Sequence, residues 1–323
     1  MKKIGVFTSG GDAPGMNACI RAVVRSAAYH QVEVVGIKRG YQGMIDDEFM
    51  PLQKSDVANI IQHGGTMLKT ARSKDFMTFE GRQKAYNNIV KHGIEGLVCI
   101  GGNGTYTGAG LFYQEFGIPS IGAPGTIDND LYGTDFTIGF DTAVNTALDA
   151  IDKIRDTADA HNRVFFIEVM GRDSGFIALN SGISGGAEGI LLPEVMNDFE
   201  TLKLHFSNDQ RRAKEFSIII VAEGETEGNT YQLAEKFKEN FPECDLRVTV
   251  LGHVQRGGRP TANDRILASF LGNAAVEQLI AGKTNLCVGM VNHKLALVTY
   301  KEAIESKKTI DASLWHLSQV LSY

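Results

Sequence analysis

One loop of the sequence carries two carboxylates at a spacing that suits phosphoryl transfer. The loop is 124–130, PGTIDND, in which Asp128 and Asp130 lie two residues apart and Thr126 adds a neutral hydroxyl. Phosphoryl transfer needs a base that takes the proton of the acceptor hydroxyl and an acid that holds Mg²⁺. The two carboxylates can supply both, and Gly125 lets the backbone approach a ligand closely. An Asp-rich surface turn is the alternative, which the apolar run before the loop disfavours.

Two glycine-rich turns could bind phosphate. They are 8–17, TSGGDAPGMN, and 101–105, GGNGT, and each follows an apolar run and precedes a helical pattern. Free N–H groups at a helix start attract anions. A plain strand-to-helix turn is the alternative for either one, but two such turns in one sheet favour phosphate binding. Neither matches GxxxxGK[ST] or GxGxxG with a downstream acid, so a standard P-loop or dinucleotide site is excluded.

Basic side chains are the third requirement of a phosphate site. Arginine is the usual partner for bidentate phosphate contacts. Arginines near predicted strand ends or in polar loops are Arg72, Arg163, Arg172, Arg247 and Arg256. The segment 251–258, LGHVQRGG, joins a strand end to His253 and Arg256. A lone histidine is more often structural, but beside an arginine and two glycines we predict that His253 contacts a ligand.

Alternating strands and helices must position these loops. Short runs rich in Val and Ile predict strands at 3–8, 32–38, 96–101, 120–123, 164–170, 189–193, 217–222, 247–252 and 286–291. Apolar stripes at helical spacing lie between them, for example Val144, Leu148, Ile151 and Ile154. The alternation predicts an α/β fold with mainly parallel sheets covered on both faces. Ligands of such sheets bind beyond the carboxyl ends of the strands, where the three loops lie.

Length and composition narrow the class of protein. A chain of 323 residues favours two domains. The 32 Lys and Arg against 38 Asp and Glu give a net charge of -6, which argues against a broad nucleic-acid or anionic-membrane surface. No stretch approaches the roughly 20 apolar residues of a membrane span. The four cysteines are scattered, as expected of reduced thiols, so we expect a cytoplasmic protein.

Together, these motifs resemble the bacterial ATP-dependent 6-phosphofructokinase family over nearly the whole chain. The segments that carry the resemblance are TSGGDAPGMNA (8–18), GGT with AR (64–72), IGGNGTYTGA (100–109), PGTIDND (124–130), TIGFDTA (137–143), KIRDTA (153–158), EVMGR (168–172), PEV (193–195), VAEG (221–224) and VLGHVQRGG (250–258). PGTIDND and GHVQRGG are the most specific of them.

The resemblance implies a fold and a reaction. The fold would be the phosphofructokinase fold, two Rossmann-like three-layer α/β/α domains with mainly parallel sheets. The larger, ATP-binding domain would be 1–139 plus about 251–303, and the smaller, fructose-6-phosphate-binding domain 140–250 plus about 304–323. The enzyme would use ATP with Mg²⁺ to phosphorylate the C1 hydroxyl of fructose 6-phosphate, giving fructose 1,6-bisphosphate in the committed step of glycolysis. It would act as a homotetramer with shared active sites.

The resemblance also implies a role for each matching position. Asp128 would be the general base, Thr126 would lie beside the transferred group, and Arg72 and Arg172 would stabilise its charge. The implied catalytic set is Asp128, Thr126, Arg72, Arg172 and Gly11. ATP would be bound by Gly11, Arg72, Ser73, Gly102, Asn103, Gly104, Thr105 and Gly108, and the metal by Asn103 and Asp130. Fructose 6-phosphate would be bound by Thr126, Ile127, Asp128, Asp130, Arg163, Met170, Gly171, Arg172, Glu223, Arg247, His253, Val254, Gln255 and Arg256, of which Arg163 and Arg247 would reach it from a neighbouring subunit.

A second, regulatory site for ADP or phosphoenolpyruvate is implied as well. Its members would be Arg21, Arg25, Lys54, Asn59, Arg155, Gly186, Glu188, Arg212 and Lys214. Without the resemblance, Arg21 and Arg25 would be assigned to a solvated helix face, because they lie four residues apart. Lys54, Asn59 and Glu215 replace the Arg, Asp and Lys of the family, which removes charge complementarity to phosphate. We therefore expect weakened or altered allostery.

The chain departs from the family near the nucleotide. Asn103 stands where the family usually has an Asp tied to Mg²⁺, and an amide keeps an acceptor oxygen but lacks the charge. Either Asp130 and the nucleotide phosphates carry the metal in an active enzyme, or the chain is a non-catalytic sugar-phosphate- and nucleotide-binding paralogue. Ser73 and Lys74 also replace the usual aromatic residue and Pro after Arg72.

Two other kinases remain as alternatives. Pyrophosphate-dependent members of the family typically carry Asp at the position of Gly104 and Lys at that of Gly125, so the two glycines favour ATP. Diacylglycerol and NAD kinases share a GGDG-type loop after a strand but lack PGTIDND and GHVQRGG.

Overall fold

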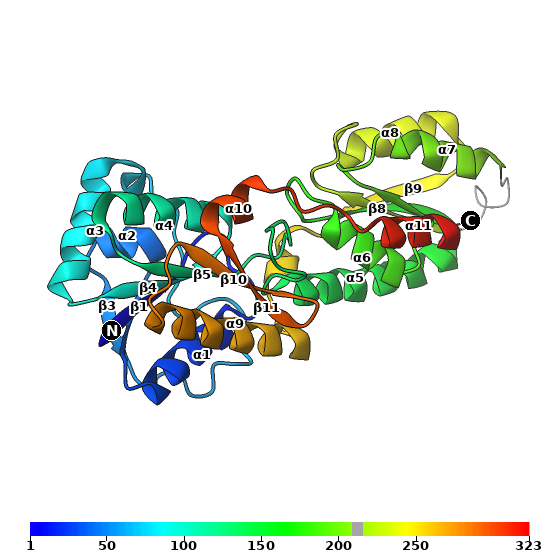
Figure 1. The fold of residues 1–323 in the computed structure, drawn as a ribbon. Helices are drawn as coiled ribbons and strands as arrows, with labels where there is room; N and C mark the ends of the chain where they lie inside the picture. Colours follow the sequence, from blue (N-terminus) through cyan, green and yellow to red (C-terminus); the bar gives the residue numbers. More distant parts are fainter. Residues whose placement is uncertain (209–215, 323) are drawn as a thin grey trace. The chain divides into compact units, whose positions relative to one another are not determined.

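The chain forms two compact units, which differ at each boundary from the domain segments expected above. The computed structural model describes residues 1–208 and 216–322 (Figure 1). The large unit comprises Met1–Ile127, Leu131–Thr142 and Arg256–Lys308. The small unit comprises Asp128–Asp130, Ala143–Gln255 and Thr309–Tyr323. The chain therefore passes from one unit to the other inside the loop 124–130.

A seven-stranded sheet is the centre of the large unit. Its strand order is β11-β10-β5-β4-β1-β2-β3. The strands are β1 (Lys3–Thr8), β2 (Glu33–Ile37), β3 (Phe49–Leu52), β4 (Gly96–Gly101), β5 (Ser120–Pro124), β10 (Leu286–Val291) and β11 (Lys294–Thr299). The five inner strands are parallel, and the edge strands β3 and β11 are antiparallel to their neighbours. All carboxyl ends of the parallel strands consequently lie at one edge of the sheet.

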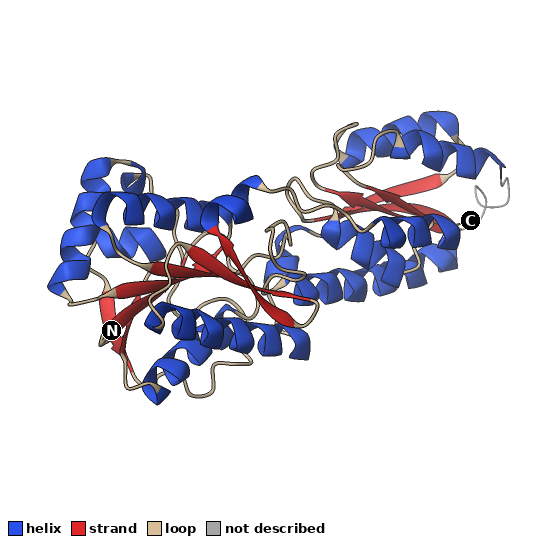
Figure 2. Ribbon diagram, in the orientation of Figure 1, coloured by secondary structure: helices blue, strands red, loops and turns tan. Residues whose placement is uncertain are grey.

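Helices cover both faces of this sheet (Figures 1 and 2). One face carries α1 (Met16–Tyr29) and α9 (Ala262–Ile280). The other face carries α2 (Gly40–Ile45), α3 (Phe79–Lys91), α4 (Asn103–Phe116) and α10 (Tyr300–Glu305), with the short 3₁₀ helix η1 (Asp75–Met77) beside them. Phe7 of β1 packs there with Tyr41, Phe76, Tyr106 and Phe112 in one buried cluster. Burial of such aromatic side chains is the main stabilising contribution to a layer of this kind.

The small unit repeats the three-layer plan around four parallel strands. Their order is β7-β8-β6-β9, and they are β6 (Arg163–Val169), β7 (Gly189–Leu191), β8 (Ser217–Ala222) and β9 (Asp245–Val250). One face carries α7 (Asp198–Asn208) and α8 (Thr230–Asn240), and the other carries α5 (Phe140–His161), α6 (Phe176–Ser184) and α11 (Ala312–Leu321). Phe237 meets Phe206 and Phe166 edge-on, with ring centroids 5.0 and 5.4 Å apart. The predicted α/β class with mainly parallel, doubly covered sheets is confirmed.

The two antiparallel edge strands were not predicted. The strand β11 follows β10 through Asn292 and His293, whose φ angles are 49° and 60°. Two consecutive positive φ values are typical of the tight turn of a hairpin. Among the described helices, none is both long and apolar enough to cross a membrane.

Candidate active site

Three loops meet at the carboxyl edge of the large sheet. They follow β1, β4 and β5, which are parallel neighbours. Thr105 Oγ1 donates to the carbonyl oxygen of Ser9 at 3.2 Å, and the Ser9 N–H donates to that of Ile100 at 3.0 Å. The Gly125 N–H donates to the carbonyl oxygen of Gly101 at 3.0 Å. The two glycine turns and the start of the PGTIDND loop are thus held together by hydrogen bonds.

The segment 66–72 braces the first glycine turn. Thr70 Oγ1 donates to the carbonyl oxygen of Gly10 at 2.7 Å, and Thr8 Oγ1 donates to that of Lys69 at 2.8 Å. These contacts place Arg72 just beyond the turn with its side chain exposed. Ser73 Oγ donates to Gln42 Oε1 at 2.7 Å, so this hydroxyl fixes the loop.

The turn is shaped for close approach at Gly11. A Cβ at Gly11 would lie 2.6 Å from Arg256 Nη1, so a side chain there would require the guanidinium group to move. The same nitrogen donates to the carbonyl oxygen of Asp12 at 3.4 Å. The structure therefore brings Arg256 of the GHVQRGG segment to the first predicted phosphate turn.

The helix α4 begins directly in the second glycine turn. Its N-cap residue is Gly102, and no side chain caps it. Backbone N–H groups in the first turn of a helix can bind an anion. A Cβ at Gly104 would meet nothing within 4 Å, whereas a Cβ at Gly108 would lie 2.8 Å from the ring of Tyr41. Gly104 therefore faces open space, and Gly108 is a buried packing position.

The PGTIDND loop is largely buried. Thr126, Asp128 and Asn129 are 9%, 7% and 3% exposed, and Asp130 is half-buried. Thr137 Oγ1 donates to the carbonyl oxygen of Thr126 at 2.6 Å. In the small unit, the hydroxyl of Ser174 donates to the carbonyl oxygen of Asp128 at 2.8 Å. A shielded, anchored aspartate suits a base that must hold one position.

A second group of predicted residues meets at the carboxyl edge of the small sheet. Glu223, after β8, accepts the N–H of Arg172 at 2.6 Å and that of Gly171 at 3.4 Å through Oε1. Gln255, in the 3₁₀ helix η3 (Gly252–Arg256), accepts the N–H of Met170 at 3.2 Å. The contacts join the ends of β6, β8 and β9. Arg172 has a φ of 56°, a left-handed conformation that is rare for a non-glycine residue and is often found at functional sites.

Comparison with known proteins agrees with this arrangement. A family model described as Phosphofructokinase matches residues 3–279. The chain belongs to the phosphofructokinase family. The ATP-dependent 6-phosphofructokinase 1 of Thermus thermophilus is 60% identical over 322 residues, with 100% of both chains covered. The ATP-dependent 6-phosphofructokinase of Cytophaga hutchinsonii is 58% identical over 322 residues, which cover 100% of this chain and 98% of that protein. The fold is similar to that of phosphofructokinase from Saccharomyces cerevisiae, with a TM-score of 0.88, 34% identity and coverage of 100% of this chain but 48% of the yeast chain.

Not every residue predicted from this phosphofructokinase resemblance lies at a carboxyl edge. Arg163 is the first residue of β6, and Arg247 pairs with Phe165 in the amino-terminal half of the neighbouring β9. Both form ion pairs with Asp245, at 2.7 and 2.5 Å. The hydrogen bond from Arg163 lowers the pKa of Asp245 below its ordinary value. Within the small unit, Arg163 is therefore separated from the 170–172 turn by the length of β6, whereas Arg247 lies midway along β9.

Some predicted effector residues of the phosphofructokinase family come together in the small unit. Arg155 donates to the carbonyl oxygens of Gly185 and Gly186, both at 2.6 Å, and pairs with Glu188 at 3.5 Å. In the large unit, Arg25, Lys54 and Asn59 are exposed, and Arg21 is half-buried on α1. Arg212, Lys214 and Glu215 lie outside the described residues.

One buried carboxylate of the large unit was not predicted from the sequence. Asp264, only 1% exposed, accepts the N–H groups of Gly139 and Thr142, each at 2.8 Å, and the hydroxyl of Thr142 at 2.5 Å. Burial raises the pKa of Asp264 to about 6. An Asp in the first turn of a helix is common, so the sequence gives no signal that Asp264 instead holds the segment 139–142.

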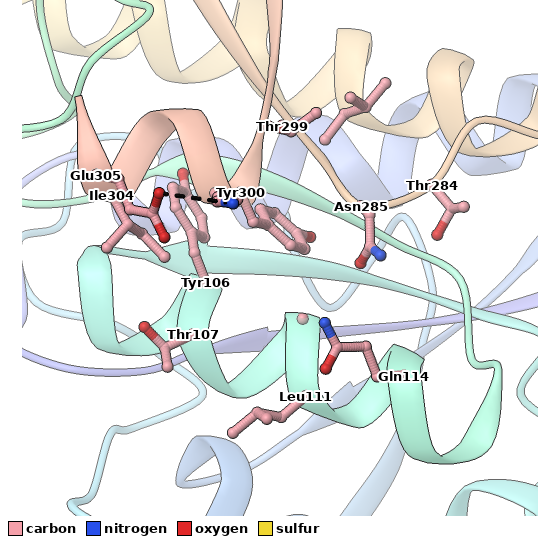
Figure 3. A pocket seen from close by; sticks show the side chains of 13 residues that line it. Tyr106, Thr107, Leu111, Gln114, Thr284, Asn285, Thr299, Tyr300, Ile304 and Glu305 are labelled. Carbon is pink, nitrogen blue, oxygen red and sulfur yellow. Dashed lines mark ion pairs between the residues drawn. The ribbon is translucent and has the colours of Figure 1, made fainter.

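A cavity of about 610 Å³ in the large unit is a separate feature. Figure 3 shows it between side chains of α4, such as Leu111 and Gln114, and Asn285 and Tyr300 at the other side. Asn285 immediately precedes β10, so the cavity lies toward the amino end of that strand. None of the predicted site residues lines it, and ligands of open α/β sheets bind at the opposite strand ends.

Proposed function

We propose that this chain is an ATP-dependent 6-phosphofructokinase. It transfers a phosphoryl group from ATP to the C1 hydroxyl of fructose 6-phosphate, which gives fructose 1,6-bisphosphate. The observation that carries the proposal is the convergence of the two glycine turns and the PGTIDND loop on three neighbouring parallel strands, held by the Thr105–Ser9 and Gly125–Gly101 hydrogen bonds. Identities of 58% and 60% to proteins of this name support it.

ATP binds the large unit in this proposal. The turn at Gly11 and the start of α4, from Gly102 to Gly104, offer backbone N–H groups to the phosphates, and Thr105 closes this turn by donating its N–H to the carbonyl oxygen of Gly102. Arg72 and Ser73 border the nucleotide from the segment that braces the first turn, and Gly108 lies deeper against Tyr41. Arg72 and Arg172, both exposed, neutralise charge that develops on the transferred group.

Fructose 6-phosphate binds the carboxyl edge of the small unit. Met170, Gly171 and Arg172 form one wall, which Glu223 and Gln255 hold in place. His253 and Val254 are exposed in η3 at the same edge. Asp128 removes the proton of the C1 hydroxyl, which turns the sugar oxygen into a nucleophile.

Mg²⁺ would accompany ATP and neutralise phosphate charge when bound. Mg²⁺ prefers oxygen ligands and keeps several of its waters. Asp130 fits this need, because it is half-buried and carries a full charge. Asn103 fits less well, because its Oδ1 is buried and an amide is neutral. We propose that Asp130 and the nucleotide phosphates supply the main ligands of the Mg²⁺ ion.

The pyrophosphate alternative is disfavoured by the space around Gly125. A Cβ there would lie 3.0 Å from Ile100 Cγ2 and 3.1 Å from Met16 Cε, so a lysine would require both side chains to shift. We also propose a homotetramer in which Arg163 and Arg247 reach the sugar phosphate of a neighbouring subunit, since Arg163 begins β6 and Arg247 lies midway along β9, neither at the carboxyl edge of their own sheet. The four cysteines are buried and form no disulfide, which is compatible with the cytoplasm that a glycolytic enzyme occupies.

A coupled assay tests the proposal. Wild type is given fructose 6-phosphate with ATP–Mg²⁺ or with pyrophosphate–Mg²⁺, beside Asp128→Ala and Asp128→Asn. We expect turnover with ATP only, and a loss of about 10²- to 10⁴-fold in kcat in both variants, which is the usual effect of removing a general base. Glu235→Gln, an exposed acid on α8, is the matched control and should retain full activity. Absence of turnover with either donor would favour the non-catalytic paralogue.

Regulation by ADP or phosphoenolpyruvate is a further part of the proposal. In the small unit, Arg155 contacts both Gly186 and Glu188. This arrangement supports a retained binding site for an anion or a nucleotide. Lys54 and Asn59 supply less charge complementarity than the family residues. Fructose 6-phosphate saturation curves with and without ADP should therefore differ only slightly, and strong activation with a large loss of sigmoidality would refute weakened allostery.

A further inference from the structure

Three carboxylates that the proposed reaction does not use converge in the small unit. Asp198 is the first residue of α7, and Glu225 and Glu227 lie in the loop between β8 and α8. One oxygen of each carboxylate lies within 4.8 Å of the others. The strands β7 and β8 are parallel neighbours, so the loops that follow them leave the same edge of the sheet.

Each of these carboxylates keeps a buried oxygen without a hydrogen-bond partner in the described part of the chain. These atoms are Asp198 Oδ1, Glu225 Oε2 and Glu227 Oε1. The second oxygen of Asp198 accepts the Leu192 N–H at 2.6 Å, and Glu225 Oε1 accepts the Glu227 N–H at 3.0 Å. Asp198 is only 4% exposed. Asp198, more than nine-tenths buried, thus lies beside the carboxylates of Glu225 and Glu227 with Oδ1 available to a ligand.

The three carboxylates form no ion pair with a nearby basic residue, Lys236, whose Nζ donates to the backbone carbonyl oxygen of Glu227 at 2.8 Å. Among residues 1–208 and 216–322, no Lys, Arg or His forms an ion pair with Asp198, Glu225 or Glu227. Burial, with smaller contributions from the charges of Glu225 and Glu227, raises the pKa of Asp198 to about 7, against the hydrogen bonds from the Leu192 and Phe199 N–H groups. Negative charges that are close together and poorly solvated are unfavourable unless a cation or protons compensate them.

We propose that Asp198, Glu225 and Glu227 bind a hard divalent cation of the size of Ca²⁺. Ca²⁺ takes oxygen ligands at about 2.4 Å, so two ligands on opposite sides of the ion lie up to roughly 4.8 Å apart. Three carboxylate oxygens that all lie within 4.8 Å of one another are compatible with that span. Mg²⁺ demands near-octahedral geometry and keeps several of its waters, so three converging carboxylates suit the flexible, oxygen-rich shell of Ca²⁺ better.

The site is separate from the metal that accompanies ATP, because neither Asn103 nor Asp130 belongs to it. A bound cation would tie the loop after β7 to the loop after β8. The second loop also carries Glu223, which holds the Arg172 N–H. The cation would therefore stabilise the small unit and the wall at the 170–172 turn.

Terbium luminescence provides a direct test in nucleotide-free, chelator-treated full-length protein, with no dependence on turnover. Trp315, the one tryptophan of the chain, lines the same small cavity as Asp198 and can sensitise a bound Tb³⁺. We expect saturable binding of one Tb³⁺ per chain that Ca²⁺ displaces at a lower concentration than Mg²⁺ does.

Near-isosteric variants locate the site. Asp198→Asn, Glu225→Gln and Glu227→Gln should each weaken Tb³⁺ binding at least tenfold. Asp130→Asn and Glu239→Gln, an exposed acid on α8, should bind as wild type does. If Asp198→Asn fails to fold, Tb³⁺ binding to Glu227→Gln tests the site by itself, because Glu227 lies in a loop and its substitution should not prevent folding.

Two outcomes would overturn the proposal. No saturable binding to wild type would mean that the carboxylates share protons instead of a cation. Binding that is lost in Asp130→Asn but retained in Glu227→Gln would assign the ion to the catalytic loop. Since neither measurement uses substrate, the result is independent of whether the chain phosphorylates fructose 6-phosphate.

Discussion

The guanidinium group of Arg256 fills the space beside Gly11 in the first phosphate turn. Arg256 Nη1 lies 2.6 Å from the position that a Cβ at residue 11 would take. The two residues are far apart in sequence, yet both belong to the large unit. The guanidinium group of Arg256 therefore occupies the space that a side chain at residue 11 would need, in a turn that a ligand must also approach.

Gly11→Ala should lower kcat/KM with little change in the free energy of unfolding. The clashing atom is the end of a flexible side chain, so Arg256 can move aside and the free energy of unfolding should change by less than about 1 kcal/mol. Displacement of Arg256 and crowding of the turn should lower kcat/KM by about 10²-fold, as small misplacements in active sites do. Steady-state kinetics and urea unfolding measure the two effects. Gly110→Ala on α4, where a Cβ meets only Tyr300 at 3.9 Å, is the control and should keep full activity.

Gly104→Asp should impair ATP binding selectively. The position faces open space, and an acid in the first turn of α4 is favourable for the helix, so the variant should fold normally. Its carboxylate would repel the phosphates, which should raise the KM for ATP at least tenfold and leave the KM for fructose 6-phosphate nearly unchanged. Gly104→Asn, with the same shape and no charge, should have a smaller effect. Equal KM values for ATP in the three proteins would exclude α4 from the phosphate site.

The sequence was sufficient to predict most of the parallel framework, for a physical reason. The strands β1, β4, β5 and β8 are buried on both faces, so each is a continuous apolar run between polar loops. The edge strands β3 and β11 lack that pattern. The four residues of β3 include Pro51, and β11 is largely half-buried or exposed. Their pairing depends on neighbours that only the folded sheet supplies.

The parts of the candidate site that are short contiguous motifs could be predicted from the sequence. The parts that are assembled from distant segments could not. The glycine turns and PGTIDND are contiguous in sequence, and the loops after neighbouring strands had to meet. By contrast, Asp264 is paired with residues more than a hundred positions away, and Asp198 meets Glu225 only after folding. A single acid in a helix or loop carries no signal of such a partner.

Asn103→Asp tests how the metal of ATP is held. The substitution adds a charge at the start of α4, where Asn103 has a buried side-chain oxygen. If Asn103 lies near the metal, the variant should lower the free Mg²⁺ concentration at half-maximal rate several-fold, because a carboxylate binds Mg²⁺ more strongly than an amide does. Titration of Mg²⁺ at a fixed ATP concentration measures the change, and Asn103→Ala provides the neutral comparison. Identical Mg²⁺ curves for all three proteins would assign the metal to Asp130 and the phosphates alone.

Asp264→Ala should destabilise the large unit. The substitution leaves two N–H groups, of Gly139 and Thr142, and the Thr142 hydroxyl without their buried acceptor. Unpaired buried donors cost about 1–3 kcal/mol each before relaxation, so we expect a loss of about 3 kcal/mol in the free energy of unfolding. Urea unfolding at neutral pH measures it, and Asp141→Ala, which removes the acid beside Asp264, should cost less.

The pKa of Asp264 gives the same contact a pH dependence with a definite sign. Burial, with a smaller contribution from Asp141, raises this pKa from 3.8 to about 6, against the hydrogen bonds from Thr142 and Gly139. Between these values the folded protein binds more protons than the unfolded chain, so the contribution of Asp264 to stability is complete below about pH 4 and declines as the pH rises through 6. The shift of about two pKa units corresponds to roughly 3 kcal/mol. The difference in unfolding free energy between wild type and the non-titrating Asp264→Asn should therefore fall by up to about 3 kcal/mol from pH 4 to pH 7, and a difference independent of pH would show that Asp264 keeps an ordinary pKa.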